Sequence, residues 1–251
     1  MKQLKTLAAL ALTALLAATF SGCLYIRIGD GKTVTGSGNV KEQEVELKQD
    51  ITGIVNDGSI DVVIDPSLDG KAVIEGDDNL IGYVELSQSG DGVLTVRYQA
   101  GFSISFAKQM RVRVPAMSTG GRVETSGSGD IVMAGGTLTG DSFDVRVSGS
   151  GDIALALEAD NVSLSIGGSG TIKAAGKANR ADVSVEGSGD VDASSLEAGD
   201  ADVEIDGSGD VNVTVNGALT GSINGSGDLF YGGGPSSVKV HVSGSGDVHE
   251  R

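Results

Sequence analysis

Gly187-Ser188-Gly189-Asp190 is one copy of a tetrapeptide that decides how the second half of this chain folds. The first glycines of successive copies lie 18 to 22 residues apart, and one copy ends in Thr171 instead of aspartate. A self-similar period of about twenty residues is typical of a solenoid, in which each repeat forms one coil. The copies begin at Gly127, Gly149, Gly168, Gly187, Gly207, Gly225 and Gly244.

Aliphatic residues stand at fixed distances from each tetrapeptide and alternate with polar residues. Val183 and Val185 precede one copy and alternate with Asp182 and Ser184, and Val191 follows it. This period of two predicts strands with one buried face. Because the strands of successive repeats run in the same direction, the sequence predicts an all-β, single-domain parallel β-helix. We expect about 19–20 residues per coil and a right-handed winding.

The same parity assigns roles to the tetrapeptide. Counted by twos along the strand, both glycines lie on the same inward side as Val185, Ile205 and Val242, whereas serine and aspartate point outward. We expect these three aliphatic residues to share one interior file. Glycine has no side chain to crush at a corner and tolerates positive φ. Aspartate and serine can bond backbone N–H groups and hold the bend. A flexible linker is the alternative, but linkers do not carry aliphatic residues at fixed offsets.

The first residues have the features of a targeting segment. Residues 1–22 contain two early lysines and an apolar run that is too short to span a bilayer. The run is followed by Phe20-Ser21-Gly22-Cys23, which resembles a bacterial lipobox except at Phe20. The resemblance implies a lipoprotein signal peptide over 1–22 and a lipid anchor to the membrane at Cys23. Simple cleavage and an uncleaved anchor are the alternatives. Leu24 resembles the sorting signal for the outer rather than the inner membrane of the cell envelope.

The rest of the chain divides into three parts by pattern. Residues 23–35 are expected to form the lipidated N-terminus and a tether. Residues 36–120 contain strand-like alternation at irregular spacing, including a candidate strand from Tyr83 to Leu86, and form either the first coils or a cap over the open edge. Residues 121–251 carry the regular repeats. The single cysteine excludes a disulfide within the chain.

A family resemblance rests on an ordered set of short motifs. They are Ile51-Thr52-Gly53-Ile54, Gly58-Ser59-Ile60-Asp61-Val62, the segment from Val73 to Leu80, Gly92-Val93-Leu94-Thr95-Val96, and Val112-Arg113-Val114-Pro115, followed by the first tetrapeptide. Over roughly 33–248 the chain resembles the GIN-type head domain of putative auto-transporter adhesins. The resemblance implies a β-helical domain on secreted or surface-anchored bacterial proteins. It implies no catalytic residues.

Charge excludes one class of partner. The formal net charge is −16, and the segment from Asp182 to Asp210 holds ten acidic residues and no basic one. A nucleic-acid-binding protein needs a basic surface, so no nucleic-acid partner is expected. Direct attraction to anionic lipid headgroups is disfavoured for the same reason.

The aspartates of the tetrapeptides raise the question of cations. Stacked coils would place them about 4.8 Å apart, where two charges repel by about 0.9 kcal/mol in water. Such a ladder must face solvent, bond to backbone N–H groups or hold cations. Calcium β-rolls repeat every nine residues, which does not match this chain, so we expect no metal site. The aspartates are Asp130, Asp152, Asp190, Asp210, Asp228 and Asp247.

No set of residues indicates catalysis or a cofactor. His241 and His249 are both expected to be solvated, and the sequence lacks a nucleophile elbow, a phosphate-binding loop and a His/Cys metal cluster. The basic residues Arg146, Lys173 and Arg180 are not marked as a lyase site. The aromatic residues Phe143, Phe230 and Tyr231 are better explained by packing than by sugar binding.

These observations predict a non-enzymatic binding module of the bacterial cell envelope, whose polar faces contact a protein or glycan. A structural envelope lipoprotein or spacer without a dedicated ligand is the alternative. A calcium-dependent, polysaccharide-active β-helix is a more remote one. The preference for a binding module comes from the family resemblance.

Overall fold

A computed structural model describes residues 32–117 and 119–251. These residues form twenty strands and one short 3-10 helix, so the predicted all-β class is confirmed. The predicted signal peptide over 1–22 and the lipidation site at Cys23 lie outside the described residues. Within the described residues, no helix is long and apolar enough to cross a membrane.

The first half of the chain contains short elements. They are β1 (Lys32–Thr35), β2 (Val40–Glu46), β3 (Gly53–Asp57), β4 (Asp61–Ile64), β5 (Lys71–Asp77), η1 (Ile81–Tyr83), β6 (Val84–Gln88), β7 (Val93–Tyr98), β8 (Phe102–Ser105), β9 (Arg111–Val114) and β10 (Gly121–Thr125).

The second half contains the strands of the regular coils. They are β11 (Ile131–Met133), β12 (Leu138–Val147), β13 (Ile153–Ile166), β14 (Ile172–Val185), β15 (Val191–Ile205), β16 (Val211–Val215), β17 (Ala218–Ile223), β18 (Leu229–Gly233), β19 (Ser237–Val242) and β20 (Val248–Glu250).

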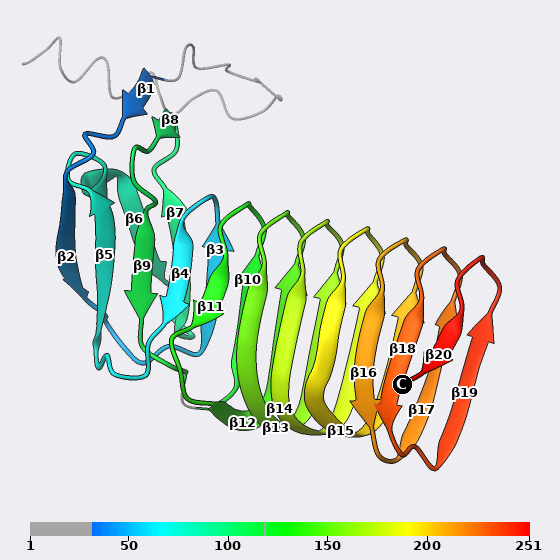
Figure 1. The fold of residues 1–251 in the computed structure, drawn as a ribbon. Helices are drawn as coiled ribbons and strands as arrows, with labels where there is room; N and C mark the ends of the chain where they lie inside the picture. The colour runs from blue at the N-terminus through cyan, green and yellow to red at the C-terminus, as the bar shows by residue number, and fades with distance from the viewer. Residues whose placement is uncertain (1–31, 118) are drawn as a thin grey trace, which may run out of the picture. The chain divides into compact units, whose positions relative to one another are not determined.

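Successive coils pair in parallel, with each residue beside its counterpart in the next repeat. In Figure 1 the coils from β10 to β20 follow one another in a row. Val185 pairs with Ile205, Ile205 with Ile223 and Ile223 with Val242. The predicted interior file is therefore confirmed, and the fold is a β-solenoid of about seven turns. Its hand stays a prediction.

The core is a set of such files rather than one globular cluster. One file runs through Ile153, Ile172, Val191, Val211 and Leu229, all of which are at most 1% exposed. Burying a side chain of this size contributes about 2 kcal/mol. Because each side chain packs on its counterparts above and below, every coil depends on its neighbours for its core.

The corner glycines are needed for space, as expected, and not for positive φ. None of the fourteen glycines in the seven tetrapeptides is among the glycines with positive φ in the described chain. A Cβ atom at Gly168 would instead overlap the backbone carbonyl oxygen of Gly149 in the preceding coil, and one at Gly187 would overlap that of Gly168. The missing side chain therefore allows neighbouring coils to approach closely along the stacking direction, and the tolerance of glycine for positive φ is not used at these corners.

Residues 36–120 combine the two architectures that the pattern left open. Strands β3 and β4 stack in parallel on β10 and β11, and they also pair in parallel with β7 and β9. Strands β2, β5 and β6 are joined to their neighbours in antiparallel pairs. The candidate strand from Tyr83 to Leu86 begins one residue late, because Tyr83 ends η1 and donates its N–H to Leu80.

A buried carboxylate fastens this irregular part. Asp77 is fully buried and accepts hydrogen bonds from the backbone N–H groups of Gly38 (2.7 Å), Ala107 (2.8 Å) and Lys108 (3.1 Å). Burial acts to raise the pKa of Asp77, but the three N–H donors outweigh it and hold the pKa below its ordinary value. One side chain therefore links β5 to two segments that lie about thirty and forty residues away in sequence.

Candidate functional site

The corner aspartates form a hydrogen-bonded ladder that is interrupted at Thr171. In every corner aspartate except Asp247, the Oδ1 atom accepts the backbone N–H of the counterpart residue in the next coil. Asp130 accepts from Asp152 at 2.9 Å, Asp190 from Asp210 at 2.8 Å, and Asp210 from Asp228 at 2.8 Å. Of the three environments considered for these charges, the structure shows two: bonding to backbone N–H groups, and exposure to solvent at Asp152, Asp190 and Asp247. Such charge-assisted bonds are stronger than neutral ones, which offsets the repulsion between neighbouring carboxylates.

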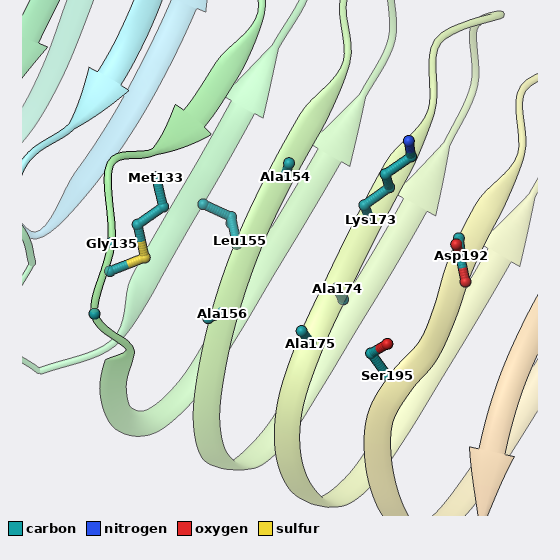
Figure 2. A pocket seen from close by; sticks show the side chains of 11 residues that line it. Met133, Gly135, Ala154, Leu155, Ala156, Lys173, Ala174, Ala175, Asp192 and Ser195 are labelled. Atoms are coloured by element: carbon teal, nitrogen blue, oxygen red, sulfur yellow. The ribbon is translucent and has the colours of Figure 1, made fainter.

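A shallow hollow opens on the outer face of the coils and is here called the alanine trough (Figure 2). Its volume is about 370 Å³. Outward positions that elsewhere hold polar residues are occupied by Ala154, Ala156 and Ala175, which are half-buried, so the floor is low and apolar. The lining residues are Met133, Gly135, Gly136, Ala154, Leu155, Ala156, Lys173, Ala174, Ala175, Asp192 and Ser195.

A β-bulge shapes one wall of the alanine trough. Lys173 pairs with Asp192, but Ala175 pairs with Ser195, so β15 contains one extra residue. Asp192 Oδ1 holds the bulge by accepting the hydroxyl of Ser194 at 2.6 Å and its N–H at 3.1 Å. The Ser194 hydroxyl is the main cause that lowers the pKa of Asp192. Partial burial opposes it, while the Ser194 N–H and the charge of Lys173 add to it.

A second hollow, here called the polar trough, is lined mainly by amides and charged groups. Its volume is about 440 Å³. Stacked outward positions bring Lys177 beside Glu158 and Glu197, and Asn179 Nδ2 donates to Asp160 Oδ1 at 2.6 Å. Donors and acceptors thus recur at the coil spacing of about 4.8 Å. The lining residues are Gly140, Glu158, Ala159, Asp160, Lys177, Ala178, Asn179, Glu197, Ala198, Gly199 and Asn216.

The basic residues considered for catalysis are not assembled into one site. Arg146 Nη2 lies 2.8 Å from Asp144 Oδ2, and Arg180 Nη2 lies 2.6 Å from Asp182 Oδ1, so each is paired with an aspartate on its own strand. Lys173 lines the alanine trough instead. Neither trough is lined by a histidine or cysteine.

The aromatic and histidine residues lie in three different environments. Phe143 is 2% exposed and belongs to the core, as expected from packing. Phe230 and Tyr231 are half-buried on β18. His241 is exposed on β19. His249 is exposed on β20 and stacks on Phe230, with ring centroids 4.9 Å apart and planes at 19°.

Sequence reasoning missed both troughs. The signal for the alanine trough was present, because Ala154, Ala156 and Ala175 stand at outward positions within strands where the other repeats often carry polar residues. The wall of the alanine trough could not be predicted from the sequence, because it is shaped by the β-bulge at Ser194. Asp77 lay within a motif that carried the family resemblance, but its burial depends on segments that are distant in sequence.

Comparison with known proteins supports the architecture. The family model described as "Putative auto-transporter adhesin, head GIN domain" matches residues 50–235. None of the curated proteins matches the chain. A putative adhesin from Bacteroides fragilis has 20% identity and a TM-score of 0.79, covering 87% of this chain and 100% of its own.

Two structures from Parabacteroides distasonis are also similar. One is described as a putative adhesin, with 25% identity and a TM-score of 0.69. The other is described as a putative lipid binding protein, with 24% identity and a TM-score of 0.70. Each alignment covers 88% of this chain and 100% of the other.

Proposed function

Because the chain belongs to the family of the putative auto-transporter adhesin, head GIN domain, we propose that it is a non-enzymatic binding module of the bacterial cell envelope. Its ligand is a protein or glycan held against the outward faces of the solenoid. The polar trough is the observation that carries this proposal. Its charged groups Glu158, Lys177 and Glu197 stand in register in three successive coils, which suits an extended ligand with repeated hydroxyl or amide groups.

The proposed route of attachment is a lipid at Cys23. The lipobox-like Phe20-Ser21-Gly22-Cys23 and the following Leu24 support an anchor in the outer membrane. Cys23→Ser should release the protein from the membrane fraction and abolish incorporation of labelled fatty acid. Leu24→Asp should redirect the lipidated protein to the inner membrane, provided that the host follows enteric-type sorting. Unchanged membrane attachment of the Cys23→Ser variant would contradict the proposal.

A screen of glycan and protein arrays with residues 24–251 tests the binding function. Lys177→Ala and Asn216→Ala remove two polar groups of the polar trough and should weaken a true ligand at least about tenfold, because each removes a hydrogen bond to the ligand. Lys239→Ala, which removes a positive charge on β19 outside the trough, is the matched control. Vesicles of neutral lipid are included because one structural neighbour is described as lipid binding.

Display at the cell surface separates the binding module from a spacer without a ligand. Protease added to intact cells should cleave a surface-displayed module, whereas a structural component of the envelope interior should be protected. Complete protection together with an empty array screen would overturn the proposal in favour of the structural role.

A further inference from the structure

One cluster of potential metal ligands stands apart from both troughs. Asp228 and Asp247 occupy the same corner slot in two adjacent coils, and His249 follows Asp247 by two residues on the same outward face. One ligand atom from each residue lies within 4.8 Å of the other two. Among the described residues, this is the one cluster of three or more histidine, cysteine or acidic groups that could hold an ion.

Two of the three side chains, those of Asp228 and His249, are held in place by neighbouring groups. The N–H of Asp247 donates to Asp228 Oδ1 at 2.8 Å, which fixes the Asp228 carboxylate and leaves Oδ2 directed at His249. His249 Nε2 lies 3.9 Å from that Oδ2 atom. The imidazole ring is supported by Phe230 in the preceding coil, on which it stacks. The side chains of Asp228 and His249 are 36% and 46% exposed, so an ion in solution has direct access.

The register explains why the cluster arises at this corner. The column that contains His249 runs through the coils at one outward position. In the preceding coils this position holds no histidine, so no imidazole nitrogen lies there beside an aspartate of the ladder. Its members are Val132, Ala154, Lys173, Asp192, Asn212, Phe230 and His249.

We propose that Asp228, Asp247 and His249 bind a divalent transition-metal ion of the zinc class. One imidazole nitrogen with two carboxylate oxygens is a donor set that suits such an ion, whereas calcium and magnesium prefer oxygen ligands alone. Tetrahedral zinc at about 2.0–2.2 Å from its ligands holds two ligand atoms about 3.3–3.6 Å apart, so side-chain rotations that bring these atoms about 1 Å closer would close the site. Water fills the remaining coordination position, and the ion offsets the repulsion between the two carboxylates.

Titration of the purified full chain with zinc chloride tests the proposal by calorimetry. The chain has two histidines, both in the last coil, so His241→Gln is a matched control for His249→Gln. We expect one site per chain, an affinity about tenfold or more weaker in the His249→Gln variant, and no change in the His241→Gln variant. Equal affinity in wild type and the His249→Gln variant, or equal loss in both variants, would overturn the proposal.

A second pair of variants separates metal binding from the structural role of the ladder. Asp228→Asn and Asp190→Asn each keep the Oδ1 acceptor for the next coil and remove one charge. Zinc affinity should fall about tenfold in the first and stay unchanged in the second, with both variants keeping the wild-type circular-dichroism spectrum. Imidazole 15N shifts should move for His249 and not for His241 on adding zinc. Equal zinc affinity in the two asparagine variants, or shifts at both histidines, would count against the site.

Discussion

Gly168 lies so close to the preceding coil that any β-carbon would overlap the carbonyl oxygen of Gly149. That oxygen also accepts the N–H of Ser169 at 2.9 Å, so the coils cannot separate to admit a methyl group without breaking a hydrogen bond. A β-carbon added at the neighbouring Gly167 would have no other atom within 4 Å. There is therefore space for a methyl side chain at Gly167 but not at Gly168.

We predict that Gly168→Ala lowers the free energy of unfolding by about 2–4 kcal/mol, because the added atom forces two backbones apart. Gly167→Ala is the control and should change it by less than about 1 kcal/mol in either direction. Urea unfolding of the two variants measures the difference. Equal stability of the two variants would contradict the assignment of close backbone contact at the corner.

The aspartate ladder gives a prediction at Asp190, away from the proposed metal site. Asp190→Ala removes the acceptor of the Asp210 N–H, which is 2.8 Å from Asp190 Oδ1, and should cost about 1–2 kcal/mol of stability. Asp190→Asn keeps an oxygen in that position and should cost less. Thermal unfolding distinguishes the two, and a larger loss in the asparagine variant would contradict the ladder's stabilising role.

Asp77 predicts a pH dependence. Its pKa in the folded state lies below that of the unfolded chain, so its contribution is present above the unfolded value of about 3.9 and is lost as pH falls toward the folded value. Asp77→Asn replaces one accepting oxygen by an NH2 donor that faces backbone N–H donors, so the variant should be less stable at pH 7 and should lose less stability between pH 5 and pH 2. Melting temperatures across that range test this, with Asp69→Asn in an exposed turn as the control.

Within the strands, one interior file contains the same residue type in two surroundings. Val185 is fully buried, whereas Val242 on β19 is 39% exposed, although both belong to the file that runs through Ile205. The energetic value of an aliphatic residue in this file therefore depends on whether a further described coil covers it.

We predict that Val185→Ala costs about 2 kcal/mol or more, because it removes buried methyl groups and leaves a cavity between two coils. Val242→Ala should cost less than about 1 kcal/mol, since much of its side chain already contacts water. Chemical denaturation of both variants measures the difference. A loss at Val242 as large as that at Val185 would mean that Val242 is covered in solution.

The strands of the regular coils could be predicted from the sequence because their period of two and their repeat spacing agree. The same period occurs in β3, which stacks in parallel, and in β2, which pairs antiparallel, so alternation alone could not separate them. Inward parity of the corner glycines was predicted, but their close backbone contact depends on the distance between coils. The alanine trough depends on one extra residue at Ser194, whose effect appears only after β14 and β15 are aligned.

The regular coils of residues 121–251 form a stack in which each coil before the last bonds to the coils on either side. Removing residues 168–186 joins Gly167 to Gly187 and deletes one coil of 19 residues, including β14. The register that remains would place Ile153 beside Val191 and Ile166 beside Ile205, as their common pairing with β14 implies. Every file therefore stays continuous across the deletion.

We predict that this deletion gives a folded protein with the same β-rich circular-dichroism spectrum and a modestly lower melting temperature, because one coil-to-coil interface is lost. Deleting residues 168–177 removes about half a coil, shifts the files and should leave the protein unfolded or aggregated. Size-exclusion chromatography and thermal unfolding compare the two. Equal behaviour of both deletions would contradict nearest-neighbour stacking.

The parallel stacking also bears on how the chain reaches this state during synthesis. Partners in adjacent regular coils are separated by about twenty residues, so each newly made coil finds its template in the segment completed just before it. Growth can therefore proceed by addition to an existing end, without waiting for distant parts of the polypeptide. The first regular coil is the exception, because β10 and β11 pair with β3 and β4, which lie about seventy residues earlier in the sequence.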